Sequence, residues 1–155
     1  MTGGACLVLT GGSSRRMGSP KAHLPFAGGT FLSTILDRLR PLDLAWTAVV
    51  RGPDLDLPAL PEAVLENPRP ESGPLGSIQV GLAAGAENFP WVLTVPVDHP
   101  AVSADTYRAL VRAASGGGAH LWVPSYRGRR GHPVVFGRPC YGDLHRAPEG
   151  QGARW

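Results

Sequence analysis

The chain has 155 residues, a net charge of +3 and 43% hydrophobic residues, enough for one domain with a substantial core. It lacks an apolar stretch of the roughly 20 residues that span a membrane, and its first residues lack the basic and small-residue pattern of a signal peptide. Basic residues do not alternate with aromatic ones either. We therefore expect a cytoplasmic protein that binds neither membranes nor nucleic acid.

The first half of the chain alternates between strand and helix signals. Residues 5–10 form a short apolar run between glycines and predict a buried parallel strand. Apolar residues after Thr30 recur at helical spacing, which predicts a helix with Thr30 as its N-cap and an end before Pro41. Residues 45–51 predict a second strand, and a short third strand is expected to end near Asn67.

The second half continues the alternation. A helix is expected to start near Ser77, and its glycines would allow close packing against a sheet. Residues 91–98 predict the strongest strand, with Asp98 at its carboxyl end, and a helix capped by Ser103 follows. Two further strands are expected at residues 120–126 and 132–139, joined by the arginine-rich turn between them.

This order of elements predicts a three-layer, doubly wound, Rossmann-like α/β fold with a mostly parallel sheet. In such sheets the ligand lies outside the carboxyl ends of the strands. The rule places the loop after Leu9 and the Asp98 carboxylate at the same edge. We therefore expect these two features to be neighbours.

The loop after the first strand is rich in groups that bind anions. Residues 11–14 read Gly-Gly-Ser-Ser, and their backbone N–H groups can form an anion-binding concavity. Arg15 and Arg16 add guanidinium donors, and Lys21, the only lysine of the chain, adds a compact movable charge. The spacing fits neither a Walker A loop nor G-x-G-x-x-G. The loop chemistry alone leaves two interpretations, a polyanion site and a glycine turn with solvated arginines.

Two other residues allow both a functional and a structural interpretation. Asp98 is suited to Mg2+, which prefers one or two carboxylates together with phosphate oxygens and water, but a carboxylate at a strand end can also cap a helix or remain solvated. His132 stands at the start of a predicted strand, where a histidine has either a structural role or one in binding an acceptor.

Four segments, in family order, resemble the signature motifs of the MobA-like nucleotidyltransferases: "LTGGSSRRMGSPKAHLPF", "NPRPESGPLGSIQVGL", "PVDHPAVS" and "GRRGHPVVF". Enzymes of this family join a nucleoside triphosphate to a phosphate-bearing acceptor and release pyrophosphate. Their best-known branches make molybdopterin guanine and cytosine dinucleotides. The resemblance therefore implies a nucleotidyltransferase whose cofactor is Mg2+, whose donor is GTP or CTP and whose acceptor is molybdopterin.

The resemblance also implies roles for individual residues. Arg16 and Lys21 would be catalytic and bind the triphosphate, Asp98 would hold Mg2+, and His132 is a candidate acceptor-site residue. The residues implied in nucleotide binding are Leu9, Gly11, Gly12, Ser13, Arg16, Lys21, Asn67, Gly73, Gly76 and Ser77.

Several alternatives stay open at this point. "LTGG" and "GPLGS" resemble the guanylyl branch, whereas "KAHLPFAGGTFL" and "GRRGHPVVFGRPC" resemble the cytidylyl branch. Family members usually continue beyond "EGQGAR" into a strand and an acidic segment that completes the metal site, whereas this sequence ends at Trp155. We therefore expect one C-terminally short domain over residues 1–155. Either the polypeptide is truncated relative to the family or the second metal ligand comes from elsewhere, and the exposed sheet edge predicts either homodimer pairing or reduced stability. The other hypotheses are a nucleotide-binding module without turnover and a transferase that uses another acceptor, such as a sugar phosphate.

Overall fold

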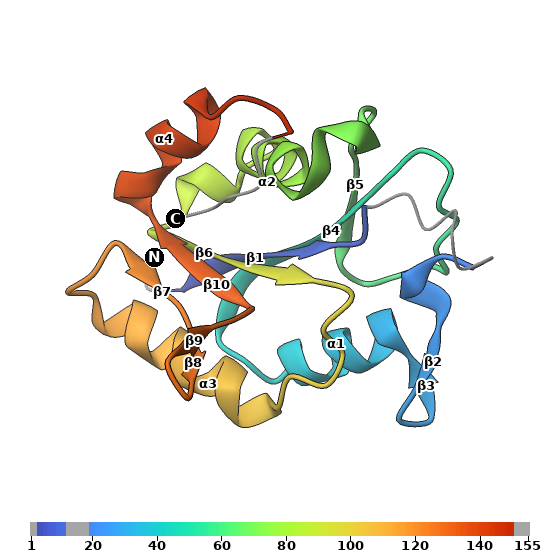
Figure 1. Ribbon diagram of the computed structural model, residues 1–155, viewed down its shortest axis with the longest axis horizontal. Coiled ribbons are helices and arrows are strands. Elements are labelled where there is room, and N and C mark those ends of the chain that lie inside the picture. The colour runs from blue at the N-terminus through green and yellow to red at the C-terminus, as the bar shows by residue number, and fades with distance from the viewer. Residues whose placement is uncertain (1–2, 12–18, 151–155) are drawn as a thin grey trace.

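The computed structural model describes residues 3–11 and 19–150, and a sheet of six strands lies at the centre of this part of the chain (Figure 1). Four neighbouring strands are parallel to one another, and the next strand, β10, runs antiparallel to both of its neighbours. The prediction of a mostly parallel sheet is therefore confirmed. In spatial order the strands are β5 (Ala63–Glu66), β4 (Leu44–Arg51), β1 (Gly4–Leu9), β6 (Trp91–Pro96), β10 (Val134–Gly137) and β7 (Leu121–Trp122).

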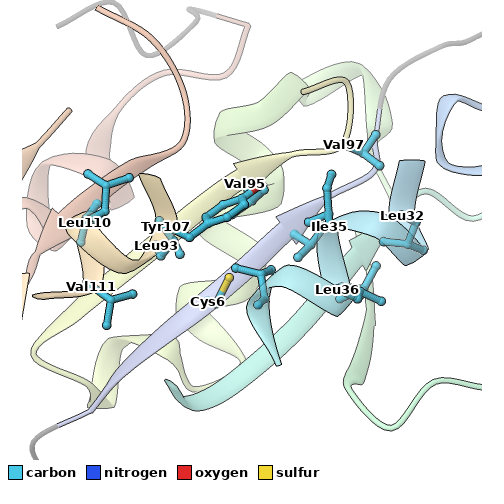
Figure 2. Close-up of a cluster of buried hydrophobic side chains, with 14 of the residues drawn as sticks. Cys6, Leu32, Ile35, Leu36, Leu93, Val95, Val97, Tyr107, Leu110 and Val111 are labelled. Carbon is cyan, nitrogen blue, oxygen red and sulfur yellow. The ribbon is translucent and has the colours of Figure 1, made fainter. Parts of the chain in front are cut away.

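Helices cover both faces of the sheet and give the three layers that the sequence predicts. In Figure 1, α2 (Gly73–Ala83) and α4 (Tyr141–Arg146) lie above the sheet, and α1 (Phe31–Leu39) and α3 (Ala104–Gly116) lie below it. Alternate side chains of β1 point to opposite faces, as strand geometry requires. Cys6 therefore packs with α1 and α3 (Figure 2), whereas Leu7 packs with α2 and α4.

Two helix starts are confirmed with their caps. At the start of α1 the Thr30 hydroxyl accepts a hydrogen bond from the backbone N–H of Ser33 at 3.1 Å, and the Ser33 hydroxyl accepts one from the N–H of Thr30 at 2.8 Å. At the start of α3 the Ser103 hydroxyl accepts from the N–H of Thr106 at 3.2 Å. Helix α1 ends at Leu39, before Pro41, as expected.

The predicted start of α2 is wrong by four residues. The helix begins at Gly73, which has φ of 70°, and continues through Pro74, so Ser77 lies inside the helix and does not cap it. Proline is well tolerated in a first helical turn, where its missing N–H would have had no partner. The expectation about the glycines is confirmed, because a Cβ at Gly81 would come within 2.3 Å of Leu7 on β1.

The late strands are shorter than predicted. The predicted strand 120–126 divides into β7 and the two residues of β8 (Ser125–Tyr126), and the predicted strand 132–139 is reduced to β10. Proline cannot donate to a strand ladder, and Pro124 and Pro133 interrupt both runs. The predicted turn contains β9 (Arg129–Arg130), which pairs with β8 in a small separate hairpin.

Two smaller differences concern the elements near the carboxyl edge. Strand β6 ends at Pro96, so Asp98 stands in the turn beyond the strand rather than at its last position. A second small hairpin, which periodicity did not predict, pairs β2 (Pro25–Phe26) with β3 (Gly29–Thr30). Among the residues that the structure describes, no helix is both long and apolar enough to cross a bilayer.

Candidate functional site

The candidate site lies where the strand order reverses. From β1 the chain proceeds through β4 and β5 on one side, then returns to β6 on the other side of β1. Leu9 is paired with Pro96 in the register, and the N–H of Val97 donates to the Leu9 carbonyl at 3.0 Å. The carboxyl ends of β1 and β6 therefore leave the sheet side by side, at the position where ligands bind in open α/β sheets.

The end of β1 is held rigidly up to the glycine loop. Thr10 is 8% exposed, and both its backbone N–H and its hydroxyl donate to the Val50 carbonyl at 3.0 Å. Leu9 is 5% exposed in the core on the α2 side of the sheet, and its carbonyl accepts from the N–H of Val97, so Leu9 itself presents little surface to a ligand. Gly11 is exposed, and a Cβ there would lie 3.4 Å from the Ser77 hydroxyl. The end of β1 thus meets the first turns of α2.

The nucleotide-loop predictions at Gly12, Ser13 and Arg16 lie outside the described residues.

Lys21 and Asp98 are brought together from distant parts of the sequence. Lys21 begins the short 3-10 helix η2 (Lys21–His23), and its Nζ lies 3.3 Å from Asp98 Oδ2. The two side chains are 41% and 44% exposed. An ion pair in this setting contributes about 0–1 kcal/mol, so little free energy opposes an exchange of these partners for the phosphates of a ligand.

Two histidines lie on the other side of Asp98. His99 Nε2 is 3.5 Å from Asp98 Oδ1, and the His99 and His132 rings are 5.1 Å apart between centroids. Partial burial lowers the pKa of His132, the nearby His99 lowers it further, and Asp98 acts in the opposite direction. His132 precedes β10, whose antiparallel pairing with β6 brings it to the same edge as Asp98. His99 was not among the predicted site residues, although its place next to Asp98 was a signal.

Asn67 shapes the loop that leads from β5 into α2. It is 3% exposed, and its side-chain amide donates to the hydroxyls of Ser72 at 3.2 Å and Ser77 at 3.1 Å. Its Oδ1 accepts from the N–H of Arg69 at 3.0 Å. These bonds cross-link the two ends of the loop, so the amide of Asn67 is an internal support for the loop backbone.

The remaining predicted residues of this region are the glycines in the first turn of α2, and one of them is required by packing. A Cβ at Gly76 would lie 1.7 Å from the Ser72 hydroxyl, which itself donates to the Arg69 carbonyl at 2.6 Å. Gly73 has positive φ and open space around it, so its role is to permit the entry of the chain into α2. The buried Ser72 was missed, since serine in a turn gives no sequence signal for burial.

The side chains at this edge are suited to a metal ion that is held partly by the protein and partly by the phosphates of a bound substrate. Within residues 3–11 and 19–150, no three His, Cys, Asp or Glu side chains are grouped so that they could hold an ion by themselves. Asp98 is a single exposed carboxylate beside a cation. Mg2+ typically takes one or two carboxylates and completes its shell with phosphate oxygens and water, so Asp98 fits that ion better than a metal that requires an all-protein cage.

The sequence matches the family model of the MobA-like NTP transferase domain over residues 6–155. It is 37% identical over 114 residues to a probable molybdenum cofactor guanylyltransferase of Rhodopirellula baltica, covering 69% of this chain and 54% of that protein. A probable molybdenum cofactor guanylyltransferase of Mycobacterium tuberculosis H37Rv is 33% identical over 154 residues, or 97% of this chain and 75% of its own length.

A solved structure has the same architecture. The crystal structure of Rv0371c from Mycobacterium tuberculosis H37Rv matches with a TM-score of 0.78 at 25% identity, covering 97% of this chain and 80% of that one. The present chain thus spans about half of the Rhodopirellula protein and three quarters of the mycobacterial relative.

Proposed function

The chain belongs to the MobA-like NTP transferase family, and from this premise we propose that it transfers a nucleoside monophosphate to a phosphate-bearing acceptor. An acceptor phosphate oxygen would attack the α-phosphorus of the triphosphate, and the bond to the β-phosphate would break with release of pyrophosphate. We propose molybdopterin as the acceptor and GTP ahead of CTP as the donor, because both relatives are named molybdenum cofactor guanylyltransferases.

The pairing of Lys21 with Asp98 at the strand reversal is the observation that carries this proposal. Transfer between phosphates needs positioning and charge neutralisation more than covalent help from the protein. Lys21 supplies a mobile positive charge for the triphosphate and for the departing pyrophosphate. Arg16, which lies outside the described residues, is proposed as the second cation.

The nucleotide itself would be held mainly by backbone groups. We propose that the backbone beyond Leu9, from Gly11 to Ser13, contacts the phosphates and sugar, and that the first turn of α2, which contains Gly73 and Gly76, contacts the base and ribose. Asn67 and Ser77 serve this role indirectly, since their hydrogen bond of 3.1 Å fixes the loop against α2. Glycines leave the backbone accessible to a flat ring.

Asp98 is the residue that we propose to hold Mg2+. When bound, the ion would neutralise phosphate charge as pyrophosphate departs. In support of this role, Asp98 is a half-exposed carboxylate with Lys21 at one oxygen and His99 at the other. His132, whose ring centroid lies 5.1 Å from that of His99, is proposed to lie on the acceptor side of the site.

The proposal is tested by measuring pyrophosphate release with GTP or CTP, Mg2+ and molybdopterin. We expect release with at least one triphosphate and a loss of about 100-fold or more in Asp98→Asn. Asp105→Asn is the matched control, because Asp105 is a carboxylate on the surface of α3 with a 90% exposed side chain. No release with either triphosphate would contradict the proposal, and calorimetric titration with GTP and CTP would then identify a binding module without turnover. If pyrophosphate is released only when a sugar phosphate replaces molybdopterin, the protein is still a nucleotidyltransferase, but its acceptor is the sugar phosphate.

A further inference from the structure

Arg38 on α1 holds the loop that carries Asp98. Its Nη1 donates to the carbonyl of Val102 at 2.7 Å and also to the carbonyl of Pro100. Both carbonyls belong to the segment between β6 and α3. The backbone bonds inside this segment are longer, at 3.3 Å from His99 N–H and 3.4 Å from Val102 N–H. The hydrogen bond from the Arg38 guanidinium to Val102 is therefore shorter than these backbone bonds, and it connects the segment to a neighbouring helix.

The same guanidinium contacts the segment that carries Lys21. Its central carbon lies 6.0 Å from the ring centroid of Phe26, within the range of a cation–π contact. Phe26 follows η2 by three residues, and its carbonyl accepts from the Thr34 hydroxyl of α1 at 3.1 Å. The N–H of Phe31 donates to the Leu24 carbonyl at 2.8 Å. The Lys21 segment is thus fixed on the helix that also presents Arg38.

The apolar residues of α1 fix the start of the Asp98 loop by packing. Val97, next to Asp98, is 5% exposed and lies in the cluster that contains Leu32 and Ile35 (Figure 2). Helix α1 is therefore the common support of both charged segments. Along this helix, Arg38 is the residue whose side chain contacts both segments by polar or cation–π interactions.

We propose that Arg38 is a positioning residue for the transfer reaction, an inference that rests on the function proposed above. By holding Pro100 and Val102 against α1, it keeps the Asp98 carboxylate opposite the Lys21 ammonium. It acts through the backbone and touches neither reacting group. Arginine suits the task because its planar fork supplies several donors in fixed directions, whereas lysine has one rotating ammonium.

The chain offers a matched control on the same helix. Arg40 follows α1 by one residue and donates to Glu62 at 2.7 and 3.2 Å and to Asp37 at 2.9 Å. Its hydrogen bonds are comparable in number to those of Arg38, but their acceptors are Glu62 and Asp37 rather than the loop that carries Asp98. Arg38→Met and Arg40→Met therefore both remove a guanidinium and its bonds, and differ in whether the site is affected.

The first measurement uses the single lysine of the sequence and needs no substrate. Protein labelled with 13C,15N-lysine gives one side-chain ammonium (15Nζ) signal, from Lys21, and Asp98→Asn defines the shift of that signal without the ion pair. In Arg38→Met we expect the signal to move at least about halfway toward this reference, since a loop released by about 1 Å no longer presents the carboxylate. In Arg40→Met the signal is expected to remain at the wild-type position. An unmoved signal in folded Arg38→Met would overturn the proposal.

The second measurement separates binding from turnover. Because Arg38 is not among the residues proposed to contact the nucleotide, Arg38→Met is expected to lower kcat about tenfold or more with less than about a threefold change in KM. Arg38→Lys should recover part of kcat, and Arg38→Gln, which adds no second lysine, replaces Arg38→Met in both measurements if the latter does not fold. Equal kcat in the Arg38 and Arg40 variants would overturn the positioning role. Absence of turnover in the wild type would instead contradict the proposed function, and the lysine signal would still decide the role of Arg38.

Discussion

The Lys21 ammonium lies 3.3 Å from the Asp98 carboxylate, although the two residues are 77 positions apart in the sequence. Lys21 follows the glycine loop after β1, and Asp98 follows the neighbouring strand, β6. Their meeting depends on the parallel pairing of these strands, which places both carboxyl ends at the same edge. The pair is exposed enough to be rearranged by a charged ligand, and the predictions for the site depend on this geometry.

Replacement of Lys21 by arginine is expected to lower pyrophosphate release even though the charge is kept. A compact ammonium can approach a phosphate from several directions, whereas the larger planar guanidinium has a fixed donor geometry. We expect a loss of about tenfold in Lys21→Arg and about 100-fold in Lys21→Met, the second value being typical for removal of one electrostatic group. Steady-state rates at saturating GTP measure both effects. Wild-type turnover in Lys21→Arg would show that only the charge matters.

Asn67→Ala is expected to destabilise the fold and weaken nucleotide binding together. The substitution removes the donor to the buried hydroxyls of Ser72 and Ser77 and the acceptor for the Arg69 N–H. We expect the free energy of unfolding to fall by about 2–3 kcal/mol in urea denaturation, because buried polar groups lose their partners.

The exposed Asn88 supplies the control for this prediction, and Asn88→Ala is expected to change stability by less than about 0.5 kcal/mol. Equal effects in the two asparagine variants would argue against a supporting role for Asn67.

Gly81→Ala is expected to destabilise α2 against the sheet despite the better helix propensity of alanine. Alanine gains about 1 kcal/mol over glycine in a helix, but the added Cβ would lie 2.3 Å from Leu7, which is fully buried. Overpacking typically costs about 1–3 kcal/mol, so we expect a net loss of about 1–2 kcal/mol in denaturant unfolding.

Two further variants test the cause of this loss. Gly116→Ala at the end of α3 meets open space and is expected to be neutral or stabilising. Leu7→Ala should cost less in the Gly81→Ala background than in the wild type, because it removes the clash. Strict additivity of the two changes would contradict the packing explanation.

Glu62 is expected to make stability depend on pH in the acid range. Its side chain is 8% exposed, and hydrogen bonds from the Arg40 guanidinium hold the pKa of Glu62 below its usual value of 4.5. The folded state therefore favours the carboxylate. Its stabilisation is complete above the ordinary pKa and is lost as the pH falls through the lowered one.

The measurement compares wild type with Glu62→Gln by denaturation at pH 7 and at about pH 3. We expect Glu62→Gln to be less stable by about 1 kcal/mol at pH 7, a value reduced by the exposure of Arg40, and the difference to shrink in acid. Asp37→Asn is the control, since Asp37 binds the same arginine with a 69% exposed carboxylate. A difference that stays constant between the two pH values would rule out the Arg40–Glu62 pair as its source.

The sequence by itself determined the elements whose signals are local. The cap at Thr30, the helix after Ser103 and the apolar run of β1 were predicted because each depends on residues within a few positions of one another. The order of these elements was enough to predict the three-layer architecture and to predict that Asp98 lies near the end of β1. The four ordered motifs were enough for the family.

Tertiary structure alone decided the features that depend on distant partners. The start of α2 at Gly73, the antiparallel direction of β10 and the burial of Asn67 follow from packing and hydrogen bonds that periodicity does not encode. Arg38 is the clearest case, because in sequence it is one polar residue on an amphipathic helix. Its carbonyl partners lie 62 and 64 positions away, and only the folded chain brings them within reach of the guanidinium.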